Sequence, residues 1–282
     1  MRRAPWNAAD EFDYYHASPR FVREHAERQV IFEREAFLPG LQLDRSFGLL
    51  DSSLLQNSRV LDIGAGESIL SEALALAAGA EEVIAVDAVP KQIWAAAAHH
   101  RASPRLQFII AGVSDLPFED ACFDLVVGNL ILHHVMPLEP LLESVLRVLR
   151  PGGRFIAIEP SPLVGMLRHE KSPKNEAPIR PGVVARALRS VGFDQARTTY
   201  WWTRMQTDRL GPLSPAYRVE AVAPGSGART EKVLRRPLRD TVLPGLSIDT
   251  SCPFADMVES QAAEIRDLCS HAESVAGFRA EL

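Results

Sequence analysis

Three aspartates have the clearest potential for chemistry, because each comes at the end of a short apolar run. Asp62 lies within the segment Val-Leu-Asp-Ile-Gly-Ala-Gly-Glu-Ser at residues 60–68. Asp87 closes the run Val-Ile-Ala-Val, and Asp115 follows the apolar run at residues 106–111. If these runs are parallel strands, their carboxyl ends lie at one edge of a sheet, where open α/β sheets bind ligands. The pattern therefore predicts a binding edge for a nucleoside that carries an ammonium group.

A glycine turn lies just beyond Asp62, with Gly64 and Gly66 on either side of Ala65. Glycine lets the backbone turn tightly and lets a ligand approach without a Cβ in the way. A Gly-x-Gly turn also occurs at dinucleotide sites, but the third glycine of that fingerprint is missing here, and Asp62 would repel a pyrophosphate. S-adenosylmethionine (SAM) has no phosphate, and Asp62 could hold its ammonium group. The turn therefore favours SAM over NAD as the cofactor.

The other two aspartates suit the rest of the same nucleoside. Asp87 could accept hydrogen bonds from both ribose hydroxyls. Asp115 could accept one from the exocyclic amine of adenine, flanked by the backbone of Val113 and Ser114. Each aspartate also has a simpler explanation, since an isolated carboxylate at such a place often caps a helix or ends a strand. As an ordered set, the three residues favour a ligand role.

Two histidines and a glutamate could serve the acceptor of the reaction. His133 and His134 follow the fourth apolar run, and either could act as a general base because an imidazole titrates near neutrality. Local packing or hydrogen bonding is the alternative for both. Glu159 ends the fifth run, where it faces the acceptor side or simply terminates a strand. Asp124, in a Phe-Asp-Leu-Val pattern, is predicted to support the sheet edge rather than contact a ligand.

The elements that would position these residues alternate between short apolar runs and amphipathic stretches. This alternation is typical of βαβ units with a parallel sheet covered on both faces. The predicted strands span residues 59–63, 82–86, 106–111, 123–128, 154–158, 195–203 and 216–222. The predicted helices span residues 68–78, 90–100, 138–149 and 182–191. We therefore predict an α/β fold, with a doubly wound sheet of about seven strands, helices on both faces and an antiparallel last strand.

Two flanking regions extend the predicted domain of residues 56–223. Residues 1–55 read as helical, with a charged amphipathic stretch in their middle. Residues 224–282 begin with a Gly-, Arg- and Pro-rich part that we predict to be exposed and partly mobile, and they end in one more helix at 253–278. Arginines in this extension are predicted to form a solvated basic stretch or, alternatively, to bind an anionic group of the acceptor. They are Arg235, Arg236 and Arg239.

Three further segments complete the pattern: Ser-Asp-Leu-Pro-Phe at 114–118, Phe-Asp-Leu-Val at 123–126 and Leu-Arg-Pro-Gly-Gly at 149–153. With the glycine turn and Asp87, they resemble the class I SAM-dependent methyltransferases, particularly the small-molecule group that includes the ubiquinone and menaquinone biosynthesis enzymes. The resemblance extends over residues 59–159 and more weakly to 222, with Ser68 where many relatives have a glycine. It implies a Rossmann-like fold and the transfer of a methyl group from SAM to O, N or C of a small acceptor, without a metal.

The resemblance also implies which residues contact the ligands. The residues expected at the cofactor are Tyr15, Asp62, Gly64, Ala65, Gly66, Asp87, Ala88, Val113, Ser114, Asp115, Asn129 and Leu130. Asn129 and Leu130 would lie beneath the sulfonium, and Tyr15 would belong to an N-terminal helical lid over the cofactor. The residues expected at the acceptor are Tyr14, His134, Glu159, Trp201 and Trp202, with His133 or His134 as the base. The two tryptophans have alternatives, since they could line a homodimer interface or pack in the core.

Composition limits the remaining possibilities. The formal net charge of −5 gives no general attraction to nucleic acid. The three cysteines are widely spaced, and the sequence shows neither a secretory signal nor a membrane span, so we expect a cytoplasmic protein. The alternatives to a methyltransferase are a SAM-binding protein without methyl transfer and, less favoured, an NAD-dependent oxidoreductase. The acceptor stays open between secondary metabolism, quinone and lipid pathways.

Overall fold

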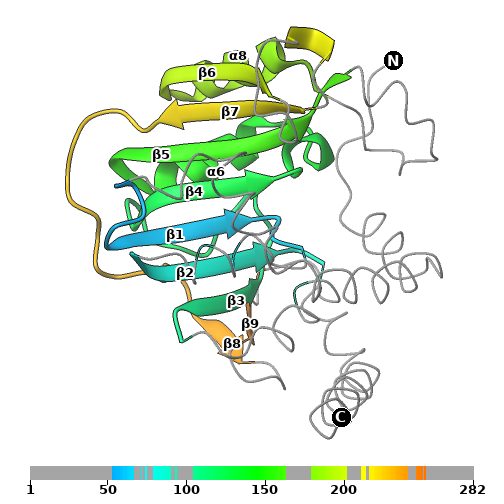
Figure 1. Ribbon diagram of the computed structural model, residues 1–282. Coiled ribbons are helices and arrows are strands. Elements are labelled where there is room, and N and C mark those ends of the chain that lie inside the picture. Colours follow the sequence, from blue (N-terminus) through cyan, green and yellow to red (C-terminus); the bar gives the residue numbers. More distant parts are fainter. Residues whose placement is uncertain are drawn as a thin grey trace, which may run out of the picture.

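The computed structural model describes residues 53–66, 71, 74, 79–89, 93, 104–162, 179–201, 211–213, 216–240, 246–249 and 251 (Figure 1). Their strands form one sheet of nine, in the order β6-β7-β5-β4-β1-β2-β3-β9-β8. Residues 1–52, nearly all of the predicted lid, and the predicted terminal helix at 253–278 lie outside the described residues. Within the described part of the chain, no helix is long and apolar enough to cross a membrane.

The five predicted central strands are confirmed. They are β1 (Ser58–Ile63), β2 (Ala80–Asp87), β3 (Leu106–Ile110), β4 (Phe123–Asn129) and β5 (Leu149–Pro160). Neighbouring strands among them pair in parallel. All six residues of β1 are buried, because a central parallel strand is covered on both faces and its apolar side chains pack against both layers.

Helices cover both faces of the sheet. On one face, α6 (Glu139–Val148) and α8 (Pro181–Val191) pack their apolar sides into a core that also holds Leu61 and Ile63 of β1. On the opposite face, Leu74 and Ile93 are helical and fully buried in a second core. The other residues of the predicted helices at 68–78 and 90–100, Ser71 apart, lie outside the described residues.

The Leu-Arg-Pro-Gly-Gly segment at residues 149–153 is the first part of β5, which begins directly after α6 without a separate loop. Gly152 has a φ of +76°, a left-handed conformation that L side chains rarely adopt. A Cβ at Gly153 would lie 2.9 Å from the carbonyl oxygen of Arg150, so this position also excludes a side chain. The segment is therefore structural, and β5 begins five residues before the predicted start at residue 154.

A hairpin completes one edge of the sheet, where strands were predicted at residues 195–203 and 216–222. It consists of β6 (Asp194–Trp201) and β7 (Ala216–Val222), which pair antiparallel. β7 also pairs antiparallel with β5, so it lies between β5 and the edge strand β6. The predicted antiparallel last strand is thus confirmed for this edge.

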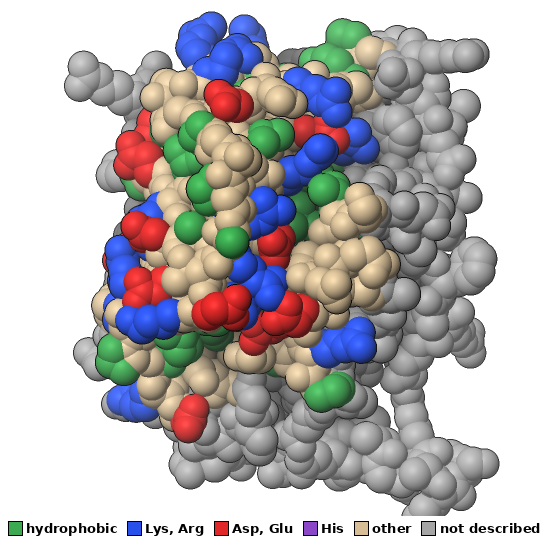
Figure 2. All heavy atoms as spheres, turned by 90° about the vertical axis from the view of Figure 1, so that its left-hand side faces the viewer, with side chains coloured by type: hydrophobic (Ala, Val, Ile, Leu, Met, Phe, Trp, Pro, Cys, Tyr) green, Lys and Arg blue, Asp and Glu red, His purple; other side chains and the backbone are tan. Residues whose placement is uncertain are grey.

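Beyond β7, residues 224–237 form a strap along the amino ends of the parallel strands, on the left of Figure 1. Most of its side chains are exposed, as predicted. Its backbone is nevertheless anchored to the turns before β4: Thr230 donates to the carbonyl of Ala121 at 2.7 Å, and Glu119 donates to that of Val233 at 2.8 Å. Acidic and basic side chains lie next to one another over this face of the molecule (Figure 2).

The strap leads into two short strands that the sequence analysis missed, β8 (Leu238–Asp240) and β9 (Leu246–Asp249). β9 pairs in parallel with β3, and β8 pairs antiparallel with β9. The prediction of about seven strands therefore fell short by two. Strands of three and four residues are too short for a hydrophobic period to show, and the same sheet continues past the predicted domain limit at residue 223.

Candidate functional site

The glycine turn after β1 lies where the sequence placed it, at the carboxyl edge of the sheet. Gly64 and Gly66 have φ values of +62° and +52°. A Cβ at Gly64 would come within 2.4 Å of the Ile131 side chain, so both the conformation and the space require glycine there. Ala65 donates its backbone N–H to the carbonyl of Val86 at 3.0 Å, which ties the turn to β2.

Asp62 is buried beneath this turn, with 1% of its surface exposed. Its Oδ2 accepts a hydrogen bond from Ser71 Oγ at 2.6 Å, whereas its Oδ1 is buried and has no hydrogen-bond partner in the described part of the chain. Burial raises the pKa of Asp62 to about 7, the hydrogen bond from Ser71 opposes this, and the nearby charge of Asp87 adds to it. The turn therefore holds an unpartnered carboxylate oxygen that a cationic donor would stabilise.

Asp87, at the end of β2, is 8% exposed and joins the turn to the following loop. Its Oδ2 accepts from the Gly66 N–H at 2.8 Å, and its Oδ1 accepts from the Val89 N–H at 2.7 Å. These two contacts hold the Asp87 carboxylate at the carboxyl edge of the sheet, beside the glycine turn. Ala88 lies beside it and is half-buried.

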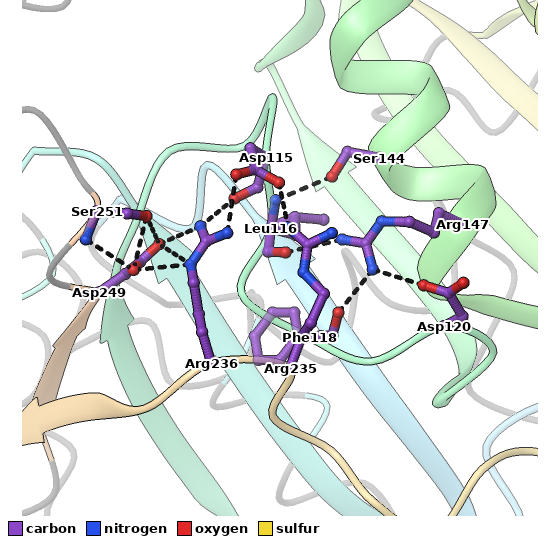
Figure 3. Close-up of polar contacts among 10 residues, drawn as sticks. All are labelled: Asp115, Leu116, Phe118, Asp120, Ser144, Arg147, Arg235, Arg236, Asp249 and Ser251. Carbon is purple, nitrogen blue, oxygen red and sulfur yellow. Dashed lines mark hydrogen bonds and ion pairs between the residues drawn. The ribbon is translucent and has the colours of Figure 1, made fainter.

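After β3, Val113 is buried, whereas Ser114 and Asp115 are exposed. The Asp115 carboxylate accepts from Arg235 and Arg236 of the strap (Figure 3). Desolvation alone would raise the pKa of Asp115, but the hydrogen bonds and charges of Arg236 and Arg235 prevail and lower it. The carboxylate that was expected at adenine thus has two guanidinium partners that the sequence analysis did not predict.

Arg236 links Asp115 to a second carboxylate (Figure 3). Its Nε donates to Asp249 Oδ1 at 3.0 Å, and its Nη1 donates to Asp115 Oδ2 at 2.8 Å. Asp249 is 1% exposed, and Ser251 also donates to it. Arg236 is therefore an internal link between β9 and the loop after β3, which corrects the expectation of a purely solvated basic stretch.

After β4, Asn129 is half-buried and Leu130 is 45% exposed. Leu130 has a φ of +60°, uncommon for a residue with a side chain, and donates its N–H to the carbonyl of Ile158 at 2.8 Å. An exposed leucine in a constrained conformation at the carboxyl edge fits a surface that faces a ligand. Both residues thus border the same edge as the glycine turn.

A buried glutamate holds the turn that follows Leu130. Glu159, in β5, is 0% exposed. Its Oε1 accepts from the Leu132 N–H at 2.7 Å, and its Oε2 accepts from the His133 N–H at 3.2 Å and lies 2.8 Å from His133 Nδ1. Glu159 was expected among the acceptor contacts, and in the structure its contacts are with this turn. His133 and Glu159 are 26 positions apart in the chain. The only signal for their contact was that β4 and β5 are neighbours in the predicted sheet.

The remaining predicted residues are less informative. His134 lies with its ring centroid 4.1 Å from that of His133, in the short helix η2 (Leu132–His134). Trp201 is the last residue of β6, on the edge hairpin. Tyr14, Tyr15 and Trp202 lie outside the described residues. Within the described ranges, no group of three or more His, Cys, Asp or Glu residues could hold a metal ion.

Comparison with known proteins shows which sequences and folds this chain resembles. Residues 61–157 match a family model described as a methyltransferase domain. A demethylmenaquinone methyltransferase of Clavibacter sepedonicus is 38% identical over 110 residues, which are 38% of this chain and 44% of that protein. A ubiquinone biosynthesis O-methyltransferase of Xylella fastidiosa is 36% identical over 103 residues, which are 36% of this chain and 41% of that protein. The aligned region therefore spans less than half the length of each relative.

Solved structures show the same fold. A methyltransferase in complex with the Haloferax volcanii Trm112 methyltransferase activator has a TM-score of 0.60 and 19% identity, over 76% of this chain and 98% of that chain. At this identity the likeness concerns the fold alone. The matching family model shows that residues 61–157 are similar to a methyltransferase domain, and the solved structure shows that the fold is that of a methyltransferase.

Proposed function

We propose that this chain binds SAM at the carboxyl ends of β1, β2 and β3 and transfers its methyl group to a small-molecule acceptor. The unpartnered Oδ1 of Asp62 supports the proposal most. A buried carboxylate oxygen without a donor costs free energy. The ammonium group of SAM would supply both the missing donor and the missing positive charge, so the residues present fit this cofactor.

The other parts of the edge have matching roles in the proposal. Asp87 would accept from the ribose hydroxyls, and the loop of Val113, Ser114 and Asp115 would lie against adenine, with the Asp115 carboxylate held by the strap. Asn129 and Leu130 would lie beneath the sulfonium. When bound, SAM supplies a methyl group on an already activated carbon, so the main tasks of the chain's own residues are to orient the acceptor and to exclude water.

Calorimetry with S-adenosylhomocysteine tests the cofactor, because this product keeps the ammonium group. We expect Asp62→Asn to weaken its binding by about 100-fold, since a charge-assisted hydrogen bond in a buried site is lost. Asp120→Asn is the matched control, because Asp120 is 75% exposed and pairs with Arg147 away from the turn. Unchanged affinity in Asp62→Asn, or tight binding of NAD to the unmodified chain, contradicts the proposal.

Methyl transfer itself needs a separate measurement. Incubation with methyl-labelled SAM and a metabolite extract is expected to give a labelled small molecule. Tight binding of S-adenosylhomocysteine without any labelled product would instead favour the second candidate, a SAM-binding protein that does not transfer the methyl group.

Three finer points belong to the same proposal. The relatives are named for ubiquinone and menaquinone biosynthesis, so we propose an aromatic acceptor related to quinone precursors. The net charge of −5 supports an acceptor other than nucleic acid. We further propose a cytoplasmic protein that forms a homodimer through the edge strand β6. Sedimentation of the unmodified chain and of a Trp201→Ala variant tests the dimer.

A further inference from the structure

We infer that Glu159 and His133 act as a pair, in which Glu159 positions His133 so that its Nε2 takes a proton from a hydroxyl group of the acceptor. This inference rests on the proposed function and deepens it. It names the base, the residue that orients the base, and the chemical class of the acceptor.

The geometry fixes which ring nitrogen of His133 carries the proton. Glu159 Oε2 lies 2.8 Å from Nδ1, and a carboxylate oxygen only accepts hydrogen bonds, so Nδ1 is the donor. In a neutral imidazole the other nitrogen, Nε2, then holds the lone pair.

The position of Glu159 cannot easily change. The carboxylate is 0% exposed, and both of its oxygens accept backbone N–H groups of the turn, from Leu132 and from His133 itself. The same residue thus fixes the backbone and the ring of His133. The residue that faces Glu159 across the sheet, Tyr217 of β7, donates its hydroxyl to the carbonyl of Ile179 and so leaves the carboxylate to the turn.

The His133 side chain is half-buried, with 13% of its surface exposed. It lies in the turn that follows Leu130, at the same edge of the sheet as the glycine turn. His134 packs against its ring with 4.1 Å between centroids. A carboxylate that only stabilised the turn would need only the two backbone N–H groups, so the additional contact to Nδ1 is what indicates a functional role.

The chemistry balances without further reactants. The acceptor oxygen forms its bond to the methyl carbon as the bond between that carbon and sulfur breaks, and the electron pair of the broken bond stays on sulfur. The hydroxyl proton moves to Nε2 of His133, and the carboxylate of Glu159 stabilises the resulting imidazolium. An amine acceptor has a free lone pair and needs no such base, so the pair favours a hydroxyl.

Nitrogen-detected NMR of His133 in the unmodified chain, bound to S-adenosylhomocysteine, is the first test. We expect the tautomer with the proton on Nδ1, and a shift toward the other tautomer in Glu159→Gln. A proton on Nε2 in the unmodified chain overturns the inference. If this buried substitution prevents folding, the spectrum of the unmodified chain and the variants at position 133 still decide.

The second test follows the label transferred from SAM into a metabolite extract. We expect His133→Asn to lower the turnover number by about 100-fold or more, and Glu159→Gln by about tenfold or more, with the affinity for S-adenosylhomocysteine unchanged. Carbon-13 NMR of the product should show the methyl group on oxygen. Full turnover in His133→Asn, loss only in His134→Asn, or a methyl group on nitrogen or carbon overturns the inference. Failure of the unmodified chain to bind S-adenosylhomocysteine would instead overturn the proposed function.

Discussion

Asp62 and Asp124 belong to neighbouring strands, β1 and β4, but lie at opposite ends of them and in opposite electrostatic surroundings. At the amino end, Asp124 accepts from the backbone of Arg59 at 2.9 Å and from the side chains of Arg150 and Arg229 at 2.6 and 2.7 Å. Desolvation opposes them, but these contacts lower its pKa. At the carboxyl end, Asp62 has one hydroxyl donor, and burial raises its pKa to about 7.

The two aspartates show how a charge that stabilises the fold differs from a charge that is available to a ligand. The side chains of Arg150 in β5 and Arg229 in the strap compensate the charge of Asp124, which thus holds the strap, β4 and β5 together. The charge of Asp62 is uncompensated in the described residues, so its burial costs stability in the free protein. A buried negative charge of this kind is tolerated where a positive ligand will meet it.

The largest expected effect is the pH dependence that Asp62 gives to the free protein. The folded pKa of about 7 lies above the ordinary value of 3.8, so between these values the folded chain binds more protons than the unfolded chain, and stability falls as pH rises. The difference corresponds to about 4 kcal/mol at most. Urea unfolding at pH 5 and pH 8 measures it, and Asp62→Asn or saturating S-adenosylhomocysteine should remove most of the slope.

Asp124 has the opposite sign, which keeps the two effects apart. Its folded pKa is lowered, so its contribution is present above the ordinary pKa and is lost as pH falls through the folded value, below about pH 4. The comparison fails if the slope between pH 5 and pH 8 is the same in the unmodified chain and in Asp62→Asn.

The next largest effect is expected from Asp124→Ala, which leaves two arginine side chains without their carboxylate. We expect a loss of about 3 kcal/mol in the free energy of unfolding, because half-buried charged groups lose their partner. Denaturant titration at neutral pH measures the loss. Asp120→Ala is the control, since it removes a carboxylate that is 75% exposed; equal losses in both variants would show that Asp124 has no special structural role.

The smallest effect is expected from Arg197→Ala on the edge hairpin. Arg197 pairs with Glu220, but its side chain is 66% exposed, and such pairs contribute below about 0.5 kcal/mol. The same titration applies. A loss as large as that of Asp124→Ala would mean that exposure does not decide which ion pairs stabilise this fold.

The central sheet and the aspartate set were predictable because their signals are local. Runs such as Val-Leu-Asp-Ile and Val-Ile-Ala-Val show a buried strand and its end within a few residues. The positive φ values of Gly64 and Gly66 likewise follow from residue type and place. The prediction that Asp124 supports the sheet was also correct, since it accepts from Arg59, Arg150 and Arg229 at the amino end of β4.

What the sequence did not predict depends on contacts between distant segments. Arg229 reaches Asp124, and Arg236 reaches both Asp115 and Asp249, although more than a hundred positions separate Arg229 from Asp124 and Arg236 from Asp115. Nothing in an Arg- and Pro-rich stretch specifies such partners in advance. The contact between Glu159 and His133 was missed for the same reason, since Glu159 resembles an ordinary strand end until β4 and β5 are aligned.

The pairing of β9 with β3 has a consequence for biosynthesis. In a nascent chain, β3 borders β2 on one side only until residues 246–249 emerge from the ribosome, a delay on the order of ten seconds at about 5–20 residues per second. During that interval the backbone of a strand that contains Leu106, Phe108 and Ile110 is unpaired along one side. Such an edge is a template for aggregation, so products of premature termination before residue 246 should precipitate where the full-length chain does not.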